Sequence, residues 1–193
     1  MSDGGGVGPE RFRSVLRHVP TSVTVVASLT ADGPKGLSIG TFVPVSLEPP
    51  LVGFFVARSS TTWPSIEGAG AFCVSVLAEH QADLSRRFSV QGGEKFDGVA
   101  WHEAPSGHPI LAGAVAWVDC TLADVHPAGD HVLVLGAVVE LGTGSGLAPL
   151  LHHGGGYRRA HDLEPALEDA SDARSGLPDG GAGPDLASGL PPV

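Results

Sequence analysis

The sequence predicts a mainly β fold, an antiparallel barrel whose ends are covered by short helices. Apolar segments of strand length recur along the 193 residues, and none is long enough to cross a membrane. Short turns rich in glycine, proline and aspartate separate these segments, whereas only a few stretches show helical spacing. Many strands joined by short turns favour a closed barrel, because closure removes exposed sheet edges.

The individual elements follow from changes in the spacing of apolar residues. Near the N-terminus, four apolar residues recur at helical spacing after Pro9: Phe12, Val15, Leu16 and Val19. From Thr21 to Leu29 apolar and polar residues alternate, which predicts a half-buried strand. Further strands are expected over 37–45, 51–57, 71–77, 115–125 and 131–141, with helices after Ser60 and over 79–88.

Composition divides the chain into three parts. Residues 1–8 are a Gly-rich arm that we expect to be flexible, and residues 9–160 form one folded domain. Residues 161–193 contain ten prolines or glycines and no aromatic residue, which predicts a mostly disordered tail with a short helix over 163–170. Seven acidic residues and one arginine give this acidic tail a charge of −6, out of −10 for the chain.

Charge and motifs argue against several classes of function. The negative net charge disfavours nucleic-acid binding, and the absence of signal-peptide and membrane-spanning patterns predicts a cytoplasmic protein. The glycines at 142–146 lack the third glycine of a dinucleotide-binding loop. No histidine or cysteine spacing supports a metal site, and no nucleophile elbow supports a hydrolase. The two cysteines do not suggest a disulfide scaffold.

Three stretches carry candidate ligand-binding residues, and each also has an ordinary structural interpretation. Ser38 and Thr41 flank Gly40, which permits close backbone approach by a ligand, although a solvent-facing strand explains the same pattern. Near the end of the helix predicted over 79–88, Arg87 and Phe88 either contact a planar ring or belong to a helix end and the core. The stretch that precedes the short helix either holds a phosphate or only caps that helix: Arg58, Ser59, Ser60 and Thr61.

A histidine begins the strand predicted over 131–141. The turn at 127–130 explains why the chain reverses there, but a turn does not require His131. This residue is either an ordinary strand-edge residue or a ligand contact at the mouth of the barrel.

Taken in order, these stretches resemble the flavin reductase family over residues 12–157. The resemblance depends on an ordered set of motifs: VPTSVTVV at 19–26, GLSIGTF at 36–42, VSLEPPL at 45–51, RSST at 58–61 and FCVSVL at 72–77. It continues through RF at 87–88, KF at 95–96, GDH at 129–131 and GGGY at 154–157. Each motif alone is weak, and their shared order and spacing carry the assignment.

This resemblance implies an FMN-binding split β-barrel that takes FMN or FAD and forms a homodimer with the site near the subunit interface. Such proteins transfer hydride from NADH or NADPH to flavin and release the reduced flavin to a separate flavin-dependent monooxygenase. Two other functions suit the same barrel: a flavin carrier or sensor without turnover, and an oxidase acting on a small amine.

The resemblance also assigns flavin contacts to residues of this chain. Ser38 and Thr41 correspond to positions near the isoalloxazine ring and the ribityl chain, and residues 58–61 match the phosphate side. Gly40 stands where many relatives have asparagine or serine, so the backbone would have to supply any hydrogen bond from this position.

Further correspondences concern the two redox rings. Arg87 and Phe88 match another flavin-contact segment, and Tyr157 matches an aromatic residue near the flavin ring. His131 matches the histidine that approaches the nicotinamide, and we expect it to orient the nicotinamide without acting as an obligatory base.

Overall fold

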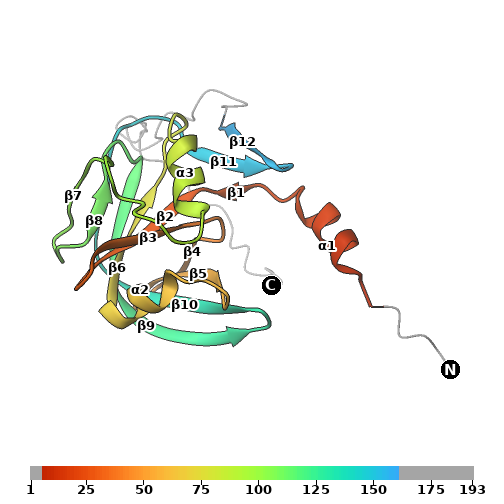
Figure 1. Cartoon of the computed structure of the whole chain (residues 1–193), viewed down its shortest axis with the longest axis horizontal. Helices are drawn as coiled ribbons and strands as arrows, with labels where there is room; N and C mark the ends of the chain where they lie inside the picture. The colour runs from red at the N-terminus through yellow and green to blue at the C-terminus, as the bar shows by residue number, and fades with distance from the viewer. Residues whose placement is uncertain (1–5, 161–193) are drawn as a thin grey trace, which may run out of the picture. The chain divides into compact units, whose positions relative to one another are not determined.

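The computed structural model describes residues 6–160, which contain three helices and twelve strands (Figure 1). The helices are α1 (Pro9–Leu16), α2 (Trp63–Ala69) and α3 (Ala82–Ser89). The strands are β1 (Thr21–Ser22), β2 (Thr24–Thr30), β3 (Gly33–Ile39), β4 (Val43–Leu47), β5 (Pro50–Ala57), β6 (Ala71–Val76), β7 (Trp101–Glu103), β8 (Pro109–Leu111), β9 (Ala116–Ala128), β10 (His131–Thr143), β11 (Leu150–His153) and β12 (Gly156–Arg159). The predicted acidic tail and its helix over 163–170 lie outside the described residues.

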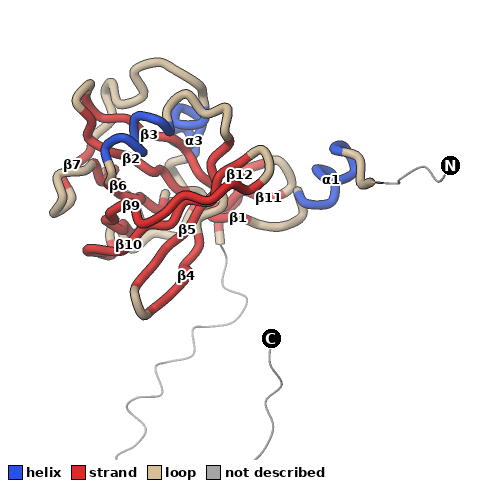
Figure 2. The backbone as a smooth tube through the Cα atoms, turned by 90° about the horizontal axis from the view of Figure 1, so that it is seen from below, coloured by secondary structure: helices blue, strands red, loops and turns tan. Residues whose placement is uncertain are grey.

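Strands dominate the described backbone, and most of them belong to one large antiparallel sheet (Figure 2). Its seven strands follow the order β3-β2-β6-β9-β10-β5-β4, while a smaller sheet contains β1, β11 and β12, and a third contains β7 and β8. The mainly β prediction is therefore confirmed. Within residues 6–160, β3 and β4 are the edges of the large sheet, so the barrel is split, as the resemblance implied, and is not closed by strand pairing.

The large sheet packs apolar side chains on both of its faces. Val26 of β2 lies in one core cluster with Trp63 of α2, whereas its neighbour Val25 lies in another cluster with Phe88 of α3. Successive strand residues point to opposite faces, so both faces of β2 are buried. A strand is present as predicted over 21–29, but its half burial was wrong, because helices cover β2 from both sides.

The bounds of several predicted elements shift by a few residues, and two of these differences lie beside the candidate site. The strand predicted over 37–45 is interrupted, since β3 ends at Ile39 and β4 begins at Val43. The helix predicted over 79–88 begins at Ala82, because Gln81 belongs to a turn. In that turn, Gln81 Oε1 accepts a hydrogen bond from the Ala78 backbone N–H at 2.9 Å, and the Gln81 N–H donates to Ala78 O at 2.8 Å.

Helix α1 has the predicted position but contributes nothing to the described core. None of its residues is buried, and Phe12 and Val15 are each 56% exposed. No helix in residues 6–160 has the length and apolar character needed to span a bilayer.

The two cysteines of the chain are free thiols in the interior of the large sheet. Cys73 on β6 and Cys120 on β9 are 0% and 1% exposed. Burial raises the pKa of both thiols, to about 12 for Cys120, because the interior disfavours the charged thiolate. The buried Asp119 carboxylate raises both pKa values further by like-charge repulsion.

We expect the native protein to resist alkylation by iodoacetamide at about pH 8, because only an accessible thiolate reacts quickly. After unfolding in guanidinium chloride, both cysteines should be labelled. Intact-protein mass spectrometry before and after unfolding measures the difference, with glutathione as the reactive control. Rapid labelling of the native chain would contradict the burial of these thiols.

Candidate functional site

A cavity of about 340 Å³ opens between β3, β5, α2 and the segment that follows α3. We call it the main cavity. Eight of the eleven residues predicted for the site line it: Ser38, Gly40, Thr41, Ser59, Ser60, Thr61, Phe88 and His131. The structure thus brings together residues from four separate sequence stretches at one wall of the split barrel.

The interruption between β3 and β4 forms one wall of the main cavity. Thr41 is fixed to β5, because its Oγ1 accepts a hydrogen bond of 2.9 Å from the Phe55 backbone N–H. A Cβ atom at Gly40 would lie 3.2 Å from Thr21 Oγ1, which is tighter than ordinary van der Waals contact. Glycine at position 40 therefore lets β1 lie close to this wall, on the side of a neighbouring cavity that Thr21 and Gly40 both line.

A short hydroxyl-rich segment between β5 and α2 forms the opposite end. Ser60 Oγ accepts a hydrogen bond of 3.2 Å from the backbone N–H of Trp63, the first residue of α2, whereas the N-cap position is Thr62, which makes no side-chain capping bond. Ser59 and Thr61 are exposed and line the main cavity beside it. Ser60 thus satisfies a free N–H at the start of α2, as the structural interpretation expected, while the assignment of this segment to a phosphate stays a prediction.

Lys95 is the cation at this end of the main cavity, and the sequence argument did not single it out as a site residue. Its Nζ donates to Gly36 O at 3.2 Å, Thr62 Oγ1 at 3.3 Å and Phe88 O at 3.2 Å. Within residues 6–160, no carboxylate forms an ion pair with this ammonium. Partial burial lowers the pKa of Lys95. The sequence contained one indication that Lys95 belongs to the site, because this residue is part of the KF motif at 95–96 that contributes to the family resemblance.

His131 lines the main cavity at the start of β10, opposite Ala57 of β5. Its Nδ1 lies 2.7 Å from Asp130 Oδ1. Since a carboxylate accepts hydrogen bonds, Nδ1 is the donor, and this contact leaves Nε2 as the ring nitrogen for a ligand. The hydrogen bond from His131 lowers the pKa of the exposed Asp130 carboxyl.

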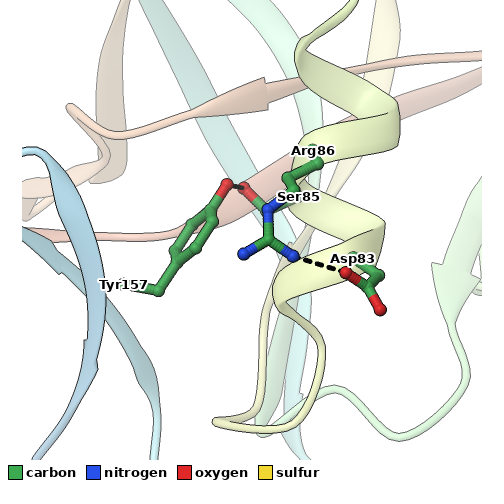
Figure 3. Close-up of polar contacts among 4 residues, drawn as sticks. All are labelled: Asp83, Ser85, Arg86 and Tyr157. Atoms are coloured by element: carbon green, nitrogen blue, oxygen red, sulfur yellow. Dashed lines mark hydrogen bonds and ion pairs between the residues drawn. The ribbon is translucent and has the colours of Figure 1, made fainter.

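A chain of hydroxyl groups leads from Tyr157 on β12 to the wall of the main cavity. The Tyr157 hydroxyl donates to Ser85 Oγ at 2.9 Å (Figure 3). Ser85 Oγ in turn lies 3.1 Å from Ser38 Oγ. A neighbouring cavity of about 240 Å³ is lined by both Tyr157 and Ser38. Tyr157 therefore reaches the main cavity through other side chains and does not line it.

Helix α3 holds the Tyr157 ring in place. The Arg86 guanidinium lies over the ring, 5.0 Å from its centroid, and Arg86 is itself paired with Asp83 one helical turn earlier (Figure 3). His152 of β11 lies directly opposite Tyr157 in the strand pair, and the two rings make an edge-to-face contact with their centroids 5.8 Å apart. These contacts fix where the Tyr157 hydroxyl points.

Both arginines that were predicted for the site, Arg58 and Arg87, lie outside the lining of the main cavity. Arg58 is exposed, and its backbone N–H donates to Asp130 O. Arg87 turns away toward the following loop, where Nη1 donates to Asp97 O at 2.6 Å. Their contribution to ligand binding stays a prediction. Within residues 6–160, no three potential metal ligands gather at one place.

Comparison with known proteins identifies the family. Residues 16–161 match the family described as flavin reductase like domain. A flavin reductase from Pseudomonas putida is 45% identical over 152 residues, covering 78% of this chain and 89% of the relative. The reductase subunit of a flavin-dependent monooxygenase from Mycobacterium tuberculosis is 42% identical, covering 78% of this chain and 82% of the relative.

A solved structure supports the same relationship. The NADH:FAD oxidoreductase from Streptomyces globisporus, in complex with NAD and FAD fragments, superimposes with a TM-score of 0.76 at 32% identity. The match covers 83% of this chain and all of the solved chain. Sequence, fold and cavity agree, and the chain belongs to the flavin reductase family.

Proposed function

We propose that this chain reduces FMN or FAD with hydride from NADH or NADPH and passes the reduced flavin to a separate flavin-dependent monooxygenase. The lining of the main cavity carries the proposal, because uncharged polar groups surround Gly40 while hydroxyls and the Lys95 ammonium occupy the other end. Family membership supports the same reaction, since one relative is a monooxygenase reductase subunit and a solved relative is an NADH:FAD oxidoreductase.

The residues of the main cavity fit an elongated ligand with a flat polar ring at one end and a phosphate at the other. A bound flavin supplies the ring that accepts hydride. Ser38 and Thr41 hold this ring and the ribityl chain, and Gly40 leaves room for the ring at the wall. The hydroxyls of Ser59, Ser60 and Thr61 hold the phosphate at the other end. The Lys95 ammonium, whose three N–H donors already have acceptors, contributes its positive charge.

The hydroxyl chain determines which hydrogen bond Ser38 offers to the ligand. In this proposal Ser85, which accepts the Tyr157 proton, donates its own proton to Ser38 Oγ. Ser38 then directs its proton into the main cavity and acts as a donor to an acceptor atom of the ring. Ser85 and Tyr157 are therefore positioning residues, because they act through Ser38.

His131 orients the nicotinamide. With Nδ1 engaged by Asp130, its Nε2 and the ring face are directed to the ligand side of the main cavity. Hydride transfer requires two rings in close and aligned contact, so orientation is the contribution that the protein must make. His131 supplies it without taking up a proton from the substrate.

A second copy of the chain covers the edge strand beside the site. On β4, Leu47 is 90% exposed, and Val43 and Val45 are 47% and 49% exposed. An apolar edge strand of this kind invites association. Light scattering should give twice the chain mass of 19.6 kDa, and Leu47→Asp should shift the protein toward the monomer. A wild-type monomer at micromolar concentration would reject the homodimer.

The test of the reaction is to mix the purified full chain with NADH and free flavin and to follow nicotinamide absorbance. Rapid loss of NADH that depends on added flavin supports the reductase. A tightly bound flavin without NADH consumption would instead indicate a carrier or sensor, and flavin reduction by a small amine alone would indicate an oxidase.

We expect His131→Ala to raise the apparent KM for NADH roughly fivefold, the effect of losing a contact worth about 1 kcal/mol, with a smaller change in the KM for flavin. His126→Ala is the matched control. His126 also pairs with a nearby aspartate, with 3.1 Å between its Nε2 and Asp124 Oδ2, but it does not line the main cavity. Equal effects on both substrates would reject the assignment of His131 to the nicotinamide.

We expect Tyr157→Phe to weaken flavin binding several-fold, because Ser85 and Ser38 lose their fixed donor direction, worth about 1 kcal/mol. Fluorescence titration with flavin measures this effect. Ser14→Ala, which removes an exposed hydroxyl on α1, serves as the control. Thermal unfolding should show that Tyr157→Phe leaves the fold intact, and unchanged flavin affinity would show that the chain of hydroxyls does not act on the ligand.

A further inference from the structure

We propose that α1 packs against the edge strand β4 of a second copy of this chain, so that two subunits exchange their N-terminal helices. The surface that receives the helix is the apolar edge of β4, formed by Val43, Val45 and Leu47. In a two-fold symmetric dimer, each subunit gives one helix and receives one. The inference rests on the homodimer of the proposed function and names the contact that holds it together.

The apolar stripe of α1 is the first argument. Its four side chains recur at positions i, i+3, i+4 and i+7 of a helix and are 47% to 56% exposed: Phe12, Val15, Leu16 and Val19. The helical turn continues to the last of them, because the Val19 N–H donates to Leu16 O at 3.0 Å. A helix of eight residues is too short to be stable in water by itself. It therefore requires a surface that covers this stripe.

The attachment of α1 directs the stripe away from its own subunit. The Arg17 carbonyl accepts a hydrogen bond of 2.9 Å from the Gly154 N–H, in the turn between β11 and β12. In Figure 1 and in Figure 2, α1 stands apart from the sheets. None of its residues is buried. The stripe is thus presented to a neighbouring molecule.

The apolar edge of β4 is the second argument. β4 is the last strand of the large sheet, and its Leu47 side chain is 90% exposed. Proteins usually blunt such an edge with charge or cover it, because an apolar edge strand invites association. The stripe of α1 and the apolar edge of β4 are both uncovered, and two copies of the chain can cover both at once.

Charge complementarity is the third argument. The helix and the residue after it carry three arginines and one glutamate: Arg11, Arg13, Arg17 and Glu10. At 100° per residue, Arg11 and Arg13 lie on either side of the apolar stripe. By contrast, residues 43–57 and 116–143, which contain β4, β5, β9 and β10, include no lysine or arginine. Their exposed carboxylates are Glu48, Asp124, Asp130 and Glu140.

The arginines of the helix have no ion-pair partner of their own. In the part of the chain that the structure describes, neither Arg11 nor Arg13 nor Arg17 pairs with a carboxylate. The basic helix and the acidic surface around β4 therefore complement each other in charge as well as in apolar character, which favours this pairing over other surfaces.

Phe12→Ala is the variant that tests the helix. It removes the largest side chain of the stripe, while alanine favours the helical conformation, so a weaker dimer reports a lost contact and not a lost helix. Ser14→Ala is the matched control, because Ser14 is an exposed residue on the opposite side of α1. Sedimentation equilibrium of the full-length protein measures the dimer dissociation constant, and circular dichroism measures the melting temperature.

We expect Phe12→Ala and Leu47→Ala each to raise the dimer dissociation constant about tenfold or more, because each removes buried apolar surface twice per dimer. Ser14→Ala should leave the constant within about twofold of wild type. In the double variant, Phe12→Ala with Leu47→Ala, the increase should be smaller than the product of the two single effects, because both side chains belong to the same contact.

Three results would overturn the exchange of helices: a wild-type dimer that Phe12→Ala leaves unchanged, single effects that multiply in the double variant, or a lower melting temperature of Phe12→Ala with the dimer intact. The last result would assign α1 to its own subunit. A wild-type monomer would reject the homodimer of the proposed function and the exchange together.

Discussion

The interruption of the large sheet between Ile39 and Val43 decides where a ligand can bind. β3 and β4 are consecutive in the chain but stand at opposite ends of the strand order, and the segment between them carries Gly40 and Thr41. Thr41 anchors this segment to β5, and the absence of a side chain at Gly40 lets the segment lie close to Thr21 of β1. Had these edges been paired, strand backbone would occupy the place of the main cavity. The split of the barrel and the binding site are therefore one structural feature.

The charge of the site is a local property that the net charge of the chain conceals. The protein carries a formal charge of −10, yet the Lys95 ammonium has no carboxylate partner in the described residues. Salt screens exposed charges beyond roughly 8–10 Å, so distant acidic residues have little effect on a partly buried cation. Oxygen atoms of Gly36, Thr62 and Phe88, which lie far apart in the sequence, hold this ammonium at one end of the main cavity. An acidic protein can hold an anionic cofactor in this way.

The side chains at the ring end of the main cavity depend on long-range contacts for their orientation. Ser38 and Ser85 are 47 residues apart, and Ser85 and Tyr157 are 72 residues apart, but their hydroxyls form one chain. The chain joins an edge strand of the large sheet, a covering helix and a strand of the smaller sheet. The positions of the three hydroxyl groups therefore depend on how the helix and the smaller sheet pack against the edge strand.

The sequence by itself determined the mainly β class and the strand-length segments, because apolar spacing acts over a few residues. The family resemblance predicted that Gly40, Thr41, Ser59 and Thr61 face one ligand, and all four line the main cavity. Only the tertiary structure decided that both faces of β2 are buried, since helices distant in sequence cover them. It also placed Lys95 in the main cavity and turned Arg87 toward Asp97. Sequence shows that a cation is present, but its partner and its burial depend on residues that meet only when the chain folds.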